Sequence, residues 1–198
     1  MKKILVILIM NVCCIQATMA SDVYVGMSIN KNESGMIPGE QPGIQVQQDR
    51  GSEAYGVYIG KDSEFHSSIE LFYLELGNFG ETLKSFSDTS TMNFRGELLG
   101  VSLAKVLYKK DEDSFYLKLG VYQWNTENYL SSNGGIFGVN SRQAYYSGID
   151  PLAGIGLIRS LGEFSVRGEF IRYNGVASDI NGSKIKVNSL SLSVSKYY

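Results

Sequence analysis

A histidine, a serine and a glutamate alternate along one short stretch of the chain. His66 is the only histidine, and Ser68 and Glu70 follow it at spacings of two residues. A histidine base, a hydroxyl nucleophile and an acid that orients the base are the groups that acyl transfer needs. Side chains two apart on a strand point the same way and lie about 6–7 Å apart. The spacing therefore permits an acyl hydrolase, and it equally describes an exposed histidine beside a turn.

Other chemistries have less support in the sequence. The only cysteines are Cys13 and Cys14, and the carboxylates are scattered, so we predict no metal site. The glycines occur singly along strands, which leaves no phosphate loop or dinucleotide motif. Without Lys2 and Lys3, 16 basic residues face 20 acidic ones, and no basic patch indicates a nucleic-acid partner. We expect no cofactor, no catalytic residue and no enzymatic activity.

Four charged residues stand in mid-strand on the face opposite the aliphatic side chains. They are Glu70, Lys118, Arg167 and Glu169. In a soluble sandwich the aliphatic face would form the core and these charges would face water. In a membrane barrel the aliphatic face would point at lipid and the charges would pair inside the lumen. The pattern alone leaves both arrangements open.

The first twenty residues are typical of a secretory signal peptide. Lys2 and Lys3 precede an apolar run over 4–10, and small residues stand before Ser21. The apolar run is too short to span about 30 Å of hydrocarbon as a helix. Lipoprotein processing at Cys13 is disfavoured because Val12 stands where a small residue is wanted. We therefore predict a signal peptide over 1–20 and one exported domain over 21–198.

The exported part alternates between apolar and polar residues with a period of two, which predicts an all-β domain. In the last strand Leu190, Leu192 and Val194 share one face, and serines occupy the other. Eight strands are predicted, at 23–30, 54–60, 65–77, 92–107, 115–125, 142–158, 164–173 and 189–198.

Long and short connections alternate between these strands. The long loops are predicted at 31–53, 78–91, 126–141 and 174–183, and the other three connections are tight turns. This asymmetry is typical of an antiparallel up-and-down barrel with periplasmic turns and extracellular loops. We therefore predict an eight-stranded transmembrane β-barrel in a bacterial outer membrane.

The chain resembles the OmpA-like transmembrane-domain family of small outer-membrane barrels. The resemblance covers most of residues 21–198 and excludes the loops. Its best segments are DPLAGIG (150–156), SVRGEFIRY (165–173) and LSLSVSKYY (190–198), with IELFY (69–73) and LGVYQW (119–124) also similar.

The resemblance implies a lumenal cluster of opposing charges and a C-terminal assembly signal. The cluster falls on Glu70, Lys118, Arg167 and Glu169, with Lys105 as a fifth member. Strict alternation points Lys105 outward, whereas a β-bulge near residue 104 would turn it inward. Tyr198 stands where the family carries the aromatic residue read by the barrel-assembly machinery.

An eight-stranded barrel is just wide enough to be filled by side chains, so an open porin is not expected. The predicted function is a structural outer-membrane protein with a charge-plugged lumen, whose loops contact a host or surface ligand, or a narrow ion pore. Its expected partners are outer-membrane lipids, lipopolysaccharide and the assembly machinery. The alternatives are a hydrolase that modifies lipid A, using the residues at 66, 68 and 70, and a soluble periplasmic lipocalin-like barrel.

Overall fold

The computed structural model describes residues 23–34, 45–49, 51–63, 66–84, 88–134, 140–176 and 185–198. The predicted signal peptide lies outside these ranges. Every regular element in them is a strand, and none of these residues forms a helix long and apolar enough to cross a membrane. The strands are β1 (Val23–Ser34), β2 (Gln45–Asp49), β3 (Gly51–Ser63), β4 (Ser67–Lys84), β5 (Asp88–Lys110), β6 (Asp113–Gly134), β7 (Asn140–Leu161), β8 (Phe164–Tyr173) and β9 (Val187–Tyr197).

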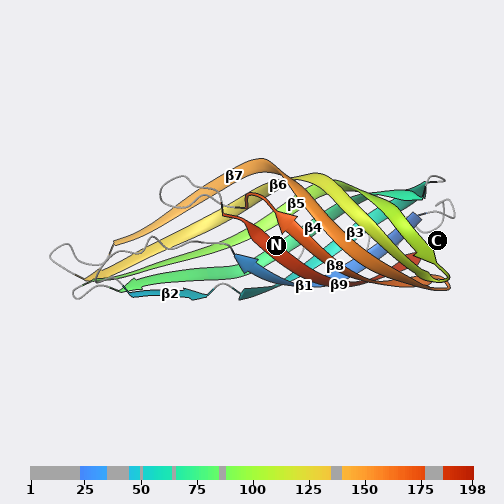
Figure 1. Ribbon diagram of the computed structural model, residues 1–198. Helices are drawn as coiled ribbons and strands as arrows, with labels where there is room; N and C mark the ends of the chain where they lie inside the picture. Colours follow the sequence, from blue (N-terminus) through green and yellow to red (C-terminus); the bar gives the residue numbers. More distant parts are fainter. Residues whose placement is uncertain are drawn as a thin grey trace.

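The strands form one closed, antiparallel barrel (Figure 1). Neighbours follow the order β2-β4-β3-β1-β9-β8-β7-β6-β5, and pairing of β4 with β5 closes the ring. Strand β2 pairs only with the last part of β4, so the other eight strands make the wall. The predicted fold class, an eight-stranded up-and-down barrel, is confirmed.

The period-two alternation decides which side chains face outward. On β9, Leu192 is 61% exposed, whereas Ser191 and Ser193 are buried in the interior. The same division holds around the wall, where exposed aliphatic side chains form a continuous apolar belt. We name this set the apolar belt, and its members include Met27, Ile29, Ile69, Leu71, Leu99, Val101, Leu103, Leu117, Leu119, Val121, Ile155, Leu157, Phe170, Leu190, Leu192 and Val194. A band of this extent is typical of a wall that faces lipid.

The strands extend further at one end of the barrel than at the other. At one end, which we call the short-turn end, tight connections join β3 to β4, β5 to β6 and β7 to β8. Asp111 and Gly162 adopt positive φ angles there, 51° and 70°, as tight turns often require. At the opposite, long-hairpin end, β5, β6 and β7 reach well beyond the rest of the wall, together with the last part of β4 (Figure 1).

Three of the four predicted long loops are wrong in their extent, and most of the fourth, over 174–183, lies outside the described residues. Strand β4 continues to Lys84 and β5 begins at Asp88, so most of the expected loop over 78–91 is strand. The expected loops over 31–53 and 126–141 are likewise shortened, the first by β2 and by extensions of β1 and β3. These segments lie beyond the apolar belt, where outward-facing side chains need not be apolar. They therefore lack the regular alternation of apolar and polar residues. Pairing with neighbouring strands keeps them extended, and on β4 and β5 the inward Phe79–Phe94 stack contributes.

Aromatic rings in the interior lie over glycines on the neighbouring strand. Tyr58 is paired with Gly26, and Tyr24 is paired with Gly60, across the same β1–β3 ladder. A Cβ atom at either glycine would collide with the opposing ring. The glycines therefore make room for large polar side chains in a narrow lumen.

Replacing Gly60 with Ala is expected to lower the free energy of unfolding by about 1–3 kcal/mol, because the methyl group displaces the Tyr24 ring. Gly168→Ala is the matched control, since nothing lies within 4 Å of a Cβ atom there. Urea unfolding in detergent micelles, followed by the fluorescence of the single tryptophan, measures both. Equal stability of the two variants would contradict the predicted collision.

Candidate functional site

Four charged side chains meet inside the barrel and neutralise one another. Lys118 Nζ lies 2.6 Å from Glu70 Oε2 and 2.8 Å from Glu169 Oε1. Arg167 Nη1 donates to Glu70 Oε1, which also accepts a 2.7 Å hydrogen bond from the Tyr24 hydroxyl. We call these four charged residues the ionic cluster. It joins β4, β6 and β8 across the lumen.

The cluster is removed from water. Glu70 is 0% exposed, and Lys118, Arg167 and Glu169 are buried almost as completely. The Arg167 guanidinium also lies over the rings of Tyr24 and Tyr58, at 4.7 and 5.0 Å from their centroids. Two acids and two bases give no net charge, which is the condition under which buried charges are tolerated.

Lys105, the fifth member predicted for this cluster, is on the outer wall instead. It is exposed on β5, and its register partners are Ser67 and Leu117. The β5–β6 ladder does contain a bulge, but it falls between Val106 and Tyr108, closer to the turn. The alternation therefore reaches Lys105 unshifted, and its side chain faces outward.

The lumen beyond the cluster, toward the long-hairpin end, contains an apolar core. Its buried members are Ala54, Leu74, Leu76, Phe79, Phe94, Leu98, Tyr122, Trp124, Leu152, Ile171, Tyr173, Val176, Ile185 and Val187. The Phe79 and Phe94 rings stack with centroids 4.8 Å apart. Trp124 Nε1 donates to Asp150 Oδ2 at 2.9 Å, so the indole nitrogen is satisfied within the core.

Val176 and Ile185, which lie between β8 and β9 in the chain, cap this core. The Gly175 carbonyl accepts a 2.9 Å hydrogen bond from the Tyr122 hydroxyl, and Val176 N donates to the Ile185 carbonyl at 3.0 Å. Val176 and Ile185 are buried. The ionic cluster and the apolar core thus occupy two successive levels of the lumen.

Sequence reasoning did not predict this apolar core. A signal was present, because Leu74 and Leu76 have the same parity as Glu70 on β4 and so face inward with it. On β5, Leu98 is an even number of residues from the inward Ser102, and on β7 the same is true of Leu152 and the inward Gly154. Both leucines therefore face inward. The outward aliphatic residues are more numerous, so the apolar pattern of each strand mainly indicates its outward face.

The residues at 66, 68 and 70 do not form a catalytic arrangement. His66 precedes β4 in a turn, with a φ angle of 53°, and its side chain is exposed. The Glu70 carboxylate bonds to Tyr24, Lys118 and Arg167 instead of orienting the histidine. The groups are therefore positioned as a rim histidine and a buried ion-pair partner.

A polar wall lies immediately beyond the apolar belt at the long-hairpin end. The last belt row across β4 to β7 is Tyr73, Leu99, Gln123 and Ile149. The next two rows are polar, and we name them the polar wall: Glu75, Glu97, Asn125 and Ser147, followed by Asn78, Arg95, Glu127 and Tyr145. Apart from Gln123 in the last belt row, the change from apolar to polar thus takes place between one outward-facing row and the next.

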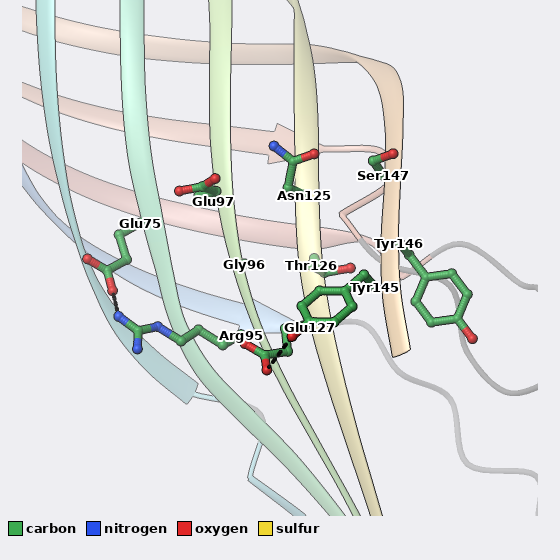
Figure 2. Close-up of a pocket in the computed structure, with 10 residues that line it drawn as sticks. All are labelled: Glu75, Arg95, Gly96, Glu97, Asn125, Thr126, Glu127, Tyr145, Tyr146 and Ser147. Carbon is green, nitrogen blue, oxygen red and sulfur yellow. Dashed lines mark hydrogen bonds and ion pairs between the residues drawn. The ribbon is translucent and has the colours of Figure 1, made fainter. Parts of the chain in front are cut away.

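A groove of about 370 Å³ follows this wall (Figure 2). Arg95 Nη2 bonds to Glu75, and this bond raises the pKa of Arg95 above its ordinary value. Glu97 accepts a 2.9 Å hydrogen bond from the Tyr73 hydroxyl, and Tyr145 lies beside Glu127. With three carboxylates and one guanidinium among its lining residues, the groove carries an excess of negative charge.

Tyr198 lies at the short-turn end, where its backbone N–H donates to the Val23 carbonyl at 2.9 Å. Lys196 Nζ is 5.0 Å from the centre of its ring. The terminal residue thereby continues the β9–β1 pairing. Recognition of Tyr198 by the barrel-assembly machinery stays a prediction.

Among the described residues, no group of three or more metal-ligating side chains could hold a metal ion.

Comparison with known proteins gives matches to solved structures alone, since no family model and no curated protein matches the chain. The crystal structure of Ail, the attachment invasion locus protein of Yersinia pestis, is 11% identical, with 91% of this chain and 100% of that chain covered and a TM-score of 0.50. Neisserial surface protein A (NspA) is 12% identical, with the same coverage and a TM-score of 0.58.

At these identities the likeness shows the fold alone. The chain has the fold of small eight-stranded outer-membrane barrels, as the sequence resemblance predicts.

Proposed function

We propose that this protein is a non-conducting, structural outer-membrane barrel that contacts its surroundings through the polar wall and hairpins of β4 to β7. The observation that carries the proposal is the filling of the lumen at two levels, in which the ionic cluster lies beneath the capped apolar core. A barrel filled in this way leaves no aqueous route through its centre. Its outer surfaces are then the parts available for interaction.

The apolar belt supports a position in the outer membrane. Its aliphatic residues would contact the acyl chains of outer-membrane lipids and lipopolysaccharide, and the polar wall would stand at the level of the headgroups. The lipid-free, lipocalin-like alternative requires apolar residues inside and charges outside, and the ionic cluster and belt have the reverse arrangement. Insertion would use the terminal strand, with Tyr198 as the predicted assembly signal.

The groove on the polar wall supports an interaction role at the cell surface. Its carboxylates exceed its one guanidinium, so it suits cationic or hydrogen-bonding groups better than anionic ones. Tyr145, exposed beside Glu127, adds an aromatic face.

Planar-bilayer recording tests whether the lumen is closed. The native protein and Glu169→Ala are both expected to give no unitary conductance above the bare bilayer. The variant removes one acid from the cluster but leaves the apolar core in the path of any ion. Conductance steps in the native protein that change in the variant would overturn the proposal and support the narrow ion pore.

Location is tested separately by fractionation and by gel mobility before and after heating. Recovery in the outer-membrane fraction with a heat-dependent shift is expected. Recovery as a soluble periplasmic protein would contradict the membrane assignment and would favour the soluble, lipocalin-like barrel instead.

A further inference from the structure

The lumen at the short-turn end contains a second cavity, which the proposed function does not use. Its volume is about 170 Å³, and it extends from the turns to Arg167 at its floor. At about 30 Å³ for each water molecule, it has room for roughly five waters or one small ion. We call it the vestibule.

The vestibule is lined mainly by hydrogen-bond donors. Ser68, Ser114 and Ser160 have the inward parity of their strands and contribute hydroxyl groups, and Tyr116 and Tyr197 contribute phenols. Lys109 and Arg167 are the cationic lining residues, His66 adds an imidazole, and Asp62 is the only acid among them. Lys109 and the Arg167 Nε–H group favour an anion, and Asp62 opposes one.

One buried hydrogen-bond donor at the floor, on the Arg167 guanidinium, lacks an ordinary hydrogen bond. Arg167 Nη1 is occupied by Glu70, but its Nε has no partner among the described residues. Buried polar groups are usually satisfied by protein, by ordered water or by an ion. The floor is therefore a place where a polar guest is stabilising.

We propose that the vestibule binds a small oxyanion, with inorganic phosphate as the representative probe. Oxyanions accept several hydrogen bonds at once, and guanidinium, ammonium and hydroxyl groups are the donors that bind them. An apolar ligand would leave the serine hydroxyls without partners. The anion enters from the short-turn end, because the ionic cluster and the apolar core close the opposite side.

The test is a calorimetric titration of the full chain with inorganic phosphate in zwitterionic detergent. Native protein is expected to show saturable binding. The double variant Lys109→Gln, Ser114→Ala is expected to weaken binding at least tenfold. Lys110→Gln is the matched control, because this neighbouring exposed lysine does not line the vestibule, and its Kd is expected to stay within about twofold of native.

Retention of the heat-dependent gel shift verifies that each variant is folded. Absence of saturable phosphate binding to native protein would overturn the proposal. So would equal weakening by Lys109→Gln, Ser114→Ala and by Lys110→Gln, which would indicate diffuse attraction to surface lysines. A titration with short-chain phosphatidylglycerol separates the two sources of phosphate. Binding of that lipid without binding of inorganic phosphate would overturn the assignment to a free oxyanion.

Discussion

Replacing Arg167 with Met is expected to lower the free energy of unfolding by about 3–5 kcal/mol. The variant leaves Glu70, which is 0% exposed, with Lys118 as its remaining cationic partner, and that lysine also serves Glu169. A buried site with two acids and one base carries an uncompensated charge. Urea unfolding in detergent micelles, followed by the fluorescence of buried Trp124, measures the loss.

Arg159→Met is the matched control for this prediction. Arg159 forms an exposed pair with Asp113 at 3.7 Å, and its loss is expected to cost about 0–1 kcal/mol. The double variant Arg167→Met, Glu70→Met should recover part of the stability, because it leaves the neutral Lys118–Glu169 pair. If Arg167→Met were no more destabilising than Arg159→Met, the cluster would not be a buried, charge-balanced unit.

Replacing Leu119 with Arg is the second large expected effect, with a cost of about 2–4 kcal/mol in lipid. Leu119 is 52% exposed on β6, and its register partners Leu103 and Ala153 also lie on the outer face. An arginine there would place its charge in hydrocarbon. Unfolding from phosphatidylcholine vesicles, again followed by Trp124, gives the measurement.

Asn125→Arg is the control on the same face of the same strand. Asn125 belongs to the polar wall, beyond the belt, so a cost of about 0–1 kcal/mol is expected. If both sites faced water, each substitution would change the free energy of unfolding by less than about 0.5 kcal/mol. Equal effects of Leu119→Arg and Asn125→Arg would therefore argue against a lipid-facing belt.

The strands of the wall and their facing follow from local sequence. Leu190, Leu192 and Val194 alternate with serines. Because alternate residues of a strand lie on opposite faces, the aliphatic residues share one face and the serines share the other. The same reasoning places Glu70 and Lys118 opposite the aliphatic residues. These predictions hold because they depend on the parity of neighbouring residues alone.

Lys105 and the loop boundaries show where local reasoning ends. Only the paired ladder reveals that the bulge follows Val106, which leaves Lys105 facing outward. The polar residues near Lys84 and Asp88 look like a loop, because nothing local distinguishes a strand with two polar faces. The inward Phe79–Phe94 stack, which holds those strands together, depends on a partner strand.

Local sequence alone predicts an all-β chain, an apolar and a polar face on most strands, and four charges on the face opposite the aliphatic residues. These predictions follow because side-chain direction repeats every two residues along a strand. Only the closed barrel decided that Glu70, Lys118, Arg167 and Glu169 touch, that an apolar core covers them, and that serines and basic groups enclose a vestibule. These contacts join β4, β6 and β8, which are not neighbours in the sheet, so they depend on closure and register around the whole ring.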